Sequence, residues 1–423
     1  MKPLGLSDLI QSEIKDKSIL CIEPGNNIQD FNFSGLNIQN SELYTLEPTD
    51  NQLEYNDRYF DYIVIHGYTL HKINDYYDNI STLNLSCDTF VIDLLGEGAN
   101  VDELLNHSNL SIVKFDNIKV LTPLYDYKGL DRKYPNIEFY KYPFAGPRVF
   151  CSKYNHMIHY DYQMSINNIS CANKIIVGKR WSDEIKDKTY TCLNNQNRHH
   201  RSLLVDGLVN SNLINNGYVS NIQGDDKKVS IDVYNRGMVE YTNHHLKIED
   251  DDINDRFTLK GKLSNSYVDV VTETSHELLP FMTEKSVKPF YSLQLPIILG
   301  YTGIIKDLRD MGFDVFDDII DHSYDTFDFS LDVDAYTDRH LYLKLNYELI
   351  IKKVNFIVDE LKRLSKLDFH KIYLDLKERL IHNQNLLYEL TIEDNNLVED
   401  YGRWIFGDNI TFNKNDYIEK IYI

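Results

Sequence analysis

Short apolar runs alternate with polar stretches of helical length between residues 18 and 122. The runs read SILCIEPG, SELYTLEP, FDYIVIHGYTL and DTFVIDLLGEG. This alternation is typical of parallel strands joined by crossover helices. Two further runs, LSIVKF and IKVLTPLY, flank Asp116 and Asn117, which predicts an antiparallel hairpin at the sheet edge. We therefore expect an α/β domain over residues 1–145.

A second alternating pattern follows a segment rich in Tyr, Asn and Pro that we expect to connect two domains. IEFYKYPF and KIIVGK are candidate strands within that segment. Beyond it, the strand KTYTCLN precedes a helix with apolar residues at helical spacing, namely Leu204, Val205, Leu208 and Val209. YVDVVTET, TEKSVKPFYSL and PIILG then read as strand, helix and strand. The pattern predicts a second α/β domain over residues 146–335.

The remainder of the chain, residues 336–423, reads as a helical C-terminal extension. Its apolar positions are spaced alternately by three and four: Tyr347, Ile350, Val354, Ile357, Leu361 and Leu364. This spacing predicts a helix that packs one face on a core. The expected architecture is thus α/β, with two Rossmann-like domains followed by helices.

Charge and cysteine content narrow the classes of partner and location. Lys plus Arg number 44 against 65 Asp plus Glu, a net charge of −21, which repels nucleic acid and anionic membranes unless cations cluster locally. The five cysteines form no Cys-x-x-Cys pair, which favours reduced thiols in the cytoplasm and no zinc ribbon. No run of about 18 apolar residues occurs, so we expect no membrane-spanning segment and no secretory signal.

The stretch NNQNRHHR directly follows the strand KTYTCLN and contains Asn195, Arg198 and Arg201. In an α/β sheet, ligands bind at the carboxyl ends of the strands, and a helix beginning there presents free N–H groups to an anion. Two guanidinium groups beside such a helix start can share a diphosphate. The alternative is that both arginines form surface ion pairs in an acidic chain.

The same logic applies to the next strand and helix. Glu273 closes the strand YVDVVTET, and Thr283, Glu284 and Lys285 open the following helix. The Glu284 carboxylate can accept both hydroxyls of a ribose, and Lys285 supplies a compact positive charge for phosphate. The alternative roles are a favourable charge in the first helical turn for Glu284 and a solvated ammonium for Lys285.

These motifs together resemble the donor-binding signature of GT-B glycosyltransferases, in particular the α-1,3-fucosyltransferase and exostosin-like groups. The resemblance spans residues 194–325, and YTGIIKDLRDMGFDVFDDIIDHSYD within it is similar to uncharacterised viral and bacterial glycosyltransferase-like proteins. It implies that Asn195 and Thr283 belong to the donor site, with Glu273 near the sugar or nucleotide. Thr274 stands where fucosyltransferases have Asn, so GDP-fucose is not implied as the donor.

The resemblance also assigns the charged groups and the reaction. It places Arg198, Arg201 and Lys285 on the diphosphate and Glu284 on the ribose, in an enzyme that moves a sugar from a nucleotide-diphosphate sugar to an acceptor hydroxyl without a metal. A base from the first domain would take the hydroxyl proton. The strand-end candidates are Glu23, His66 and Asp93, and the sequence does not choose between them.

Several alternatives stay open. CIEPGNN, with Gly25, and the later Glu47 resemble an S-adenosylmethionine-dependent methyltransferase, alone or fused to a glycosyltransferase. Asp332-Val333-Asp334 matches the metal-binding pattern of GT-A enzymes, although the match is close to chance in so acidic a chain. A non-catalytic protein that retains a transferase fold is a third class. The expected acceptor is a glycan or small hydroxyl compound, with a modified base of viral DNA as the alternative. A viral source would place the protein in the host cytoplasm.

Overall fold

The computed structural model describes residues 18–22, 42–46, 56–66, 84–93, 113–122, 134–141, 174–248, 265–274, 282–327, 339–390 and 419–422. The chain divides into two compact units. The first consists of Met1–His156 and Thr391–Ile418, and the second of Met157–Leu390 and Glu419–Ile423. The domain limits expected at residues 145 and 335 stay predictions.

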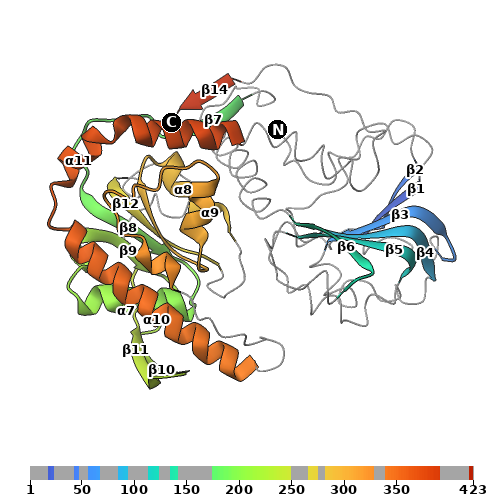
Figure 1. Cartoon of the computed structure of the whole chain (residues 1–423), viewed down its shortest axis with the longest axis horizontal. Coiled ribbons are helices and arrows are strands. Elements are labelled where there is room, and N and C mark those ends of the chain that lie inside the picture. The colour runs from blue at the N-terminus through green and yellow to red at the C-terminus, as the bar shows by residue number, and fades with distance from the viewer. Residues whose placement is uncertain are drawn as a thin grey trace. The chain divides into compact units, whose positions relative to one another are not determined.

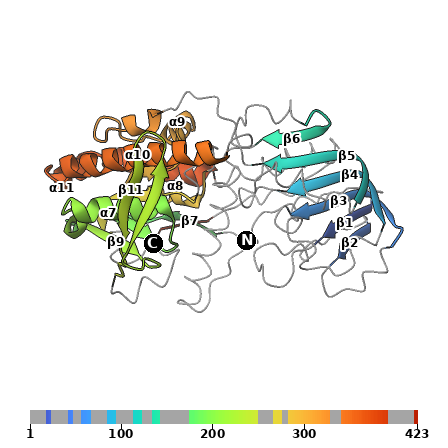
Figure 2. The same cartoon turned by 90° about the horizontal axis from the view of Figure 1, so that it is seen from below.

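The first unit is built on a parallel sheet of six strands in the order β2-β1-β3-β4-β5-β6 (Figures 1 and 2). Its strands are β1 (Ser18–Ile22), β2 (Glu42–Leu46), β3 (Tyr59–His66), β4 (Leu85–Asp93), β5 (Val113–Thr122) and β6 (Ile137–Lys141). The four apolar runs predicted as strands are confirmed as β1 to β4. Ile63, Val64 and Ile65 are consecutive in β3 and all fully buried, which is typical of a parallel strand covered on both faces.

The hairpin predicted around Asp116 and Asn117 is wrong. β5 runs straight through both residues and pairs in parallel with β4 on one side and β6 on the other. Both side chains are exposed, so the strand accommodates two polar residues without turning. IEFYKYPF, one of the candidate strands, supplies β6 and so belongs to this sheet.

The second unit contains a parallel sheet of four strands in the order β13-β12-β8-β9. The predicted strand and helix units are confirmed in it as β8 (Lys188–Asn194), α7 (His199–Asn210), β12 (Ser266–Thr272), α8 (Glu284–Tyr291) and β13 (Leu295–Leu299), whereas the sequence pattern did not predict the strand β9 (Gly217–Asn221). Every residue of β12, an inner strand of this sheet, and of β13, a strand at its edge, is buried.

The other elements of the second unit surround this sheet. They are β7 (Lys174–Gly178), which pairs with β14 (Glu419–Tyr422), the hairpin of β10 (Lys227–Val233) and β11 (Gly237–Asn243), α9 (Ile304–Asp310), α10 (Arg339–Leu364), α11 (Phe369–Asp375), the short 3-10 helices at Ile214–Asn216 and Ser323–Thr326, and a helix over residues 377–390. Within the described residues, no helix combines the length and apolar character needed to cross a lipid bilayer. Cys87 and Cys192 are free and buried.

The connections of the four-stranded sheet diverge between β8 and β12. The chain passes from β8 through α7 to β9 in one direction, and from β12 through α8 to β13 in the other. Because such crossovers are right-handed, α7 and α8 lie on opposite faces of the sheet (Figure 1). The carboxyl ends of β8 and β12 therefore flank a topological switch point, the place where open α/β sheets bind ligands.

The helix α10 packs beside α7 and confirms the predicted helical spacing after residue 336 (Figure 1). A Cβ atom on Gly207 of α7 would lie 3.0 Å from Cγ2 of Val358, so glycine permits the close approach of the two helices. Lys353 is 2% exposed, and its ammonium donates a hydrogen bond of 3.0 Å to the carbonyl of Gly300, directly after β13. This bond anchors α10 at the carboxyl edge of the sheet.

The buried ammonium of Lys353 predicts a pH dependence of stability. Burial lowers the pKa of Lys353 from 10.5 to about 8, against the opposing effect of Asp325. Between these values the unfolded chain keeps the proton that the folded chain releases, so the free energy of unfolding rises with pH. Lys353→Met removes this contribution, about 2 kcal/mol between pH 8 and 10.

Urea unfolding at both pH values measures the difference. Lys362→Met, which changes a half-exposed lysine on the same helix, should keep the wild-type dependence on pH. Identical pH slopes for wild type and Lys353→Met would contradict the assignment.

Candidate functional site

The carboxylate of Glu273 lies at the switch point, immediately after β12, and is completely buried. Its Oε1 accepts hydrogen bonds from the backbone N–H of Thr283, at 3.0 Å, and from the hydroxyl of Ser286. Its Oε2 accepts from the N–H of Thr274, at 3.0 Å, and from the hydroxyl of Thr283, at 2.7 Å. Thr283 is the N-cap of α8. The carboxylate therefore clamps the start of α8 to the end of β12.

The backbone of Glu273 makes a second set of links. Its carbonyl accepts from Nε2 of His200, at 2.8 Å, and from the guanidinium of Arg201, at 3.2 Å, both in the first turn of α7. Its N–H donates to the carbonyl of Leu299 in β13, at 3.0 Å. A Cβ atom on Gly300 would lie 3.3 Å from Cγ of Glu273, so a glycine keeps room for this side chain. Glu273 thus joins α7, α8 and β13 at one point.

Two cations that are distant in the sequence meet at Thr274. Arg198, the N-cap residue of α7, donates from Nη1 to the carbonyl of Thr274 at 2.6 Å. Lys285, in the first turn of α8, donates from Nζ to the hydroxyl of Thr274 at 3.2 Å. Arg198 is exposed and Lys285 is half-buried. The positive charges of both helix starts are therefore gathered at one strand end.

The other predicted donor-site residues occupy this same edge. Asn195 follows β8 and is half-buried, while Glu284 is the first residue of α8, with its side chain outside the description. Arg201 is 5% exposed and also reaches the carbonyl of Thr272, at 3.5 Å. Because Arg201 is buried and bonds these carbonyls, it supports the end of β12. Its contact with a diphosphate stays a prediction.

His199, which directly follows Arg198 in the sequence, contributes a neutral group beside the two cations. Nδ1 of His199 lies 2.7 Å from the hydroxyl of Tyr241, and its ring meets that of Tyr347 edge to face at 5.5 Å. Partial burial lowers the pKa of His199 below its ordinary value of 6.5, so the ring adds no positive charge near neutral pH. Arg198 and Lys285 remain the cations that meet at Thr274.

In the first unit, the structure places two of the three candidate bases on neighbouring strands. His66 ends β3, Asp93 ends β4, and the two residues are partners in the strand register, although their side chains lie outside the description. Glu23 lies outside the described residues, as do Gly25 and Glu47 of the methyltransferase alternative. The choice of base stays a prediction.

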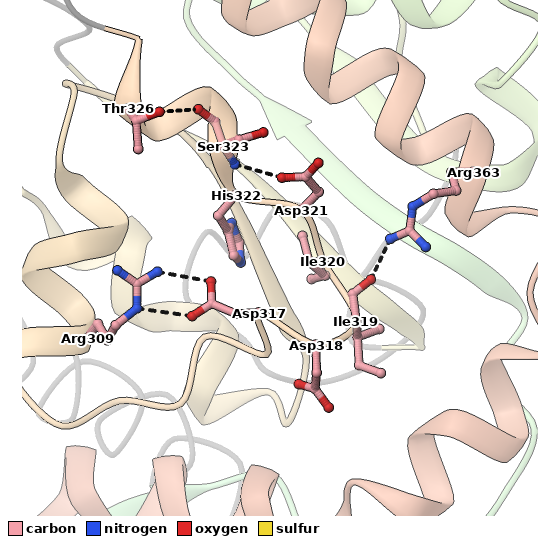
Figure 3. Close-up of a pocket in the computed structure, with 10 residues that line it drawn as sticks. All are labelled: Arg309, Asp317, Asp318, Ile319, Ile320, Asp321, His322, Ser323, Thr326 and Arg363. Atoms are coloured by element: carbon pink, nitrogen blue, oxygen red, sulfur yellow. Dashed lines mark hydrogen bonds and ion pairs between the residues drawn. The ribbon is translucent and has the colours of Figure 1, made fainter.

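A hollow of 520 Å³ elsewhere in the second unit is a weaker candidate site (Figure 3). Arg309 donates to both carboxylate oxygens of Asp317, at 2.9 and 3.0 Å, and Arg363 donates to the carbonyl of Ile319. The charge of Arg309 is neutralised by Asp317 and that of Arg363 by the carboxylate of Glu360, whereas a phosphate site needs positive charge directed at the ligand.

Within the described ranges, no group of three or more His, Cys, Asp or Glu side chains is arranged to hold an ion. Asp332 and Asp334, the metal-binding alternative, lie outside those ranges.

No protein-family profile and no curated protein sequence matches the chain. Among solved structures, it is similar to the phage T4 β-glucosyltransferase with its UDP-glucose substrate, at 12% identity and a TM-score of 0.39, over 91% of this chain and 98% of that one. An α1,3-fucosyltransferase with GDP-fucose is similar at 10% identity and a TM-score of 0.32, over 88% and 97%. These neighbours are nucleotide-sugar-dependent glycosyltransferases, the class that the motifs resemble.

The four hydrogen bonds of the Glu273 carboxylate, which clamp the start of α8 to the end of β12, predict a large loss of stability in Glu273→Gln. The amide removes the charge and turns a donor toward groups that are themselves donors, so we expect the free energy of unfolding to fall by about 2–4 kcal/mol. Urea unfolding of wild type and variant measures the loss. Glu240→Gln, at an exposed position on β11, should change the value by less than about 0.5 kcal/mol. Equal stability of the two variants would contradict the clamp.

Proposed function

We propose that this chain is a glycosyltransferase that binds a nucleoside diphosphate sugar at the switch point of the second unit. The observation that carries the proposal is the meeting of Arg198 and Lys285 at Thr274. The two residues come from separate helices on opposite faces of the sheet, so only the fold brings them together. In a chain of net charge −21, such a local gathering of cations at a ligand-binding edge favours an anionic ligand.

The chemistry of the two side chains suits a diphosphate. Arg198 offers a planar fork of donors that matches two phosphate oxygens, and Lys285 offers a compact charge for a third. The backbone N–H groups at the start of α8 add positive potential from the helix terminus. The clamp at Glu273 holds these groups in place before the ligand arrives, which reduces the entropy lost on binding.

In the proposed reaction, a base takes the proton of an acceptor hydroxyl, whose oxygen attacks the anomeric carbon of the donor sugar. The bond from that carbon to the diphosphate oxygen breaks, and negative charge develops on the departing diphosphate. Arg198 and Lys285 stabilise that charge. The base comes from Glu23, His66 or Asp93, and the acceptor is a glycan or small hydroxyl compound, with DNA as the alternative.

Nucleotide affinity tests the donor site. Lys285→Ala and Arg198→Ala should each weaken binding of the cognate nucleoside diphosphate about tenfold or more, because each removes a charge-assisted contact. Calorimetric titration with UDP, GDP and other nucleoside diphosphates measures the change. Lys362→Ala, which removes an equal charge from the far end of α10, is the matched control and should bind as wild type does. Wild type that binds no nucleotide, or undiminished binding in Lys285→Ala, would refute the proposal.

The expected independence from metal has its own test. Because Arg198 and Lys285 can balance the diphosphate charge, we expect sugar transfer or donor hydrolysis to continue in excess EDTA at no less than about half the original rate. Loss of activity in EDTA, restored by a divalent cation and abolished again by Asp332→Ala, would instead support the Asp332-Val333-Asp334 metal site.

A further inference from the structure

The amide of Asn346 in α10 is buried without a hydrogen-bond partner among the described residues. The residue is 2% exposed, and neither Nδ2 nor Oδ1 has a partner within the part of the chain that the structure describes. Buried side-chain polar groups are nearly always paired, since an unpaired one loses its hydration and gains nothing in return. A buried amide with both its donor and acceptor ends unpaired therefore calls for a physical explanation.

Contacts of two other residues of α10 indicate where Asn346 lies. The ring of the next residue, Tyr347, lies 5.5 Å from that of His199, the first residue of α7. Lys353 reaches the carbonyl of Gly300 at the end of β13. Asn346 and Lys353 are seven positions apart, so they share one face of α10, about 10 Å apart along its axis. Asn346 is thus on the face of α10 that Lys353 directs at the carboxyl edge of the sheet, near the level at which α7 begins.

The kind of group that can pair with an amide is restricted. Nδ2 donates and Oδ1 accepts, so a partner satisfies both atoms only if it has a donor and an acceptor side by side. A phosphate has acceptors alone and would leave Oδ1 unpaired. The neutral parts of a nucleotide sugar, which are the edge of the base and the hydroxyls of the sugars, offer both kinds of group.

We infer that Asn346 is a donor-binding residue that hydrogen-bonds a neutral part of the nucleotide sugar, either the base edge or a hydroxyl of the transferred sugar. This inference rests on the proposed function and extends it, because Arg198 and Lys285 address only the charge of the diphosphate. Asn346 supplies the contact that distinguishes one nucleotide sugar from another. Its unpaired amide lowers the stability of the free protein, and the bound donor satisfies it.

The variant Asn346→Leu tests this inference through opposite effects on stability and affinity. Leucine has a similar volume and no polar atoms, so the thermal midpoint of the free protein should rise. Affinity for the nucleotide sugar that wild type binds most tightly, among UDP-glucose, GDP-fucose and related donors, should fall about tenfold. Asn355→Leu, the same change at an exposed position of α10, should alter neither quantity.

Titration with both the nucleotide sugar and its nucleoside diphosphate shows whether Asn346 contacts the base or the transferred sugar. If Asn346 pairs with the base, Asn346→Leu loses affinity for both ligands to the same extent. If it pairs with the transferred sugar, only the nucleotide sugar is affected. Should the leucine variant fail to fold, Asn346→Ala carries the same expectation for affinity.

Failure of the inference is distinct from failure of the proposed function. If wild type binds nucleotide sugars and Asn346→Leu binds both ligands as tightly as wild type, the inference is overturned while the proposed function stands. If wild type binds no nucleotide sugar, both are overturned. A fall in affinity that Asn355→Leu shares would also overturn the inference, because it would reflect a general change in α10.

Discussion

The Glu273 carboxylate is the interaction on which the second unit depends. Removing a carboxylate from water is strongly unfavourable unless donors replace its hydration, and here four donors from Thr274, Thr283 and Ser286 do so. Because those donors come from the strand end and from the start of α8, the need to satisfy one charge determines where a helix begins. The Glu273 carbonyl holds α7 in the same way through His200 and Arg201.

At the carboxyl edge of the sheet, the residues that hold the elements together differ from the two cations that we propose bind a ligand. Glu273 and Arg201 are the residues whose types best suit a ligand, yet their polar groups are engaged with the protein itself. Thr274 has no charge, but it is the place where Arg198 and Lys285 converge. A rigid support beneath a charged rim is what a site for a diphosphate requires, because the cations must be held together against their mutual repulsion before the ligand arrives.

The helix α10 extends the same edge with buried polar groups that cost stability. Burial of Lys353 disfavours its charged form, and Asn346 is buried with both ends of its amide unpaired within the part of the chain that the structure describes. Lys353 compensates through its hydrogen bond to Gly300 and through the electrostatic attraction of Asp325, whereas Asn346 has no such compensation among the described residues. The two residues share a helical face but differ in this respect, which is why Lys353 is assigned to the architecture and Asn346 is proposed to contact the ligand.

The sequence by itself determined the local elements, because apolar periodicity depends only on neighbouring residues. It identified β1 to β4, the strands β8, β12 and β13, the helices α7 and α8, the apolar face of α10, and the candidates Arg198, Glu273 and Lys285. The sequence did not predict that β5 is a single parallel strand, because two apolar runs around Asp116 and Asn117 are equally compatible with a hairpin and with one continuous strand. Only the tertiary structure decided which strands are neighbours, and hence that Arg198 and Lys285 meet at Thr274 and that Glu273 is surrounded by donors. It also decided that Asn346 is buried without a partner in the described ranges. Each of these facts depends on contacts between residues far apart in the chain, which no local pattern encodes.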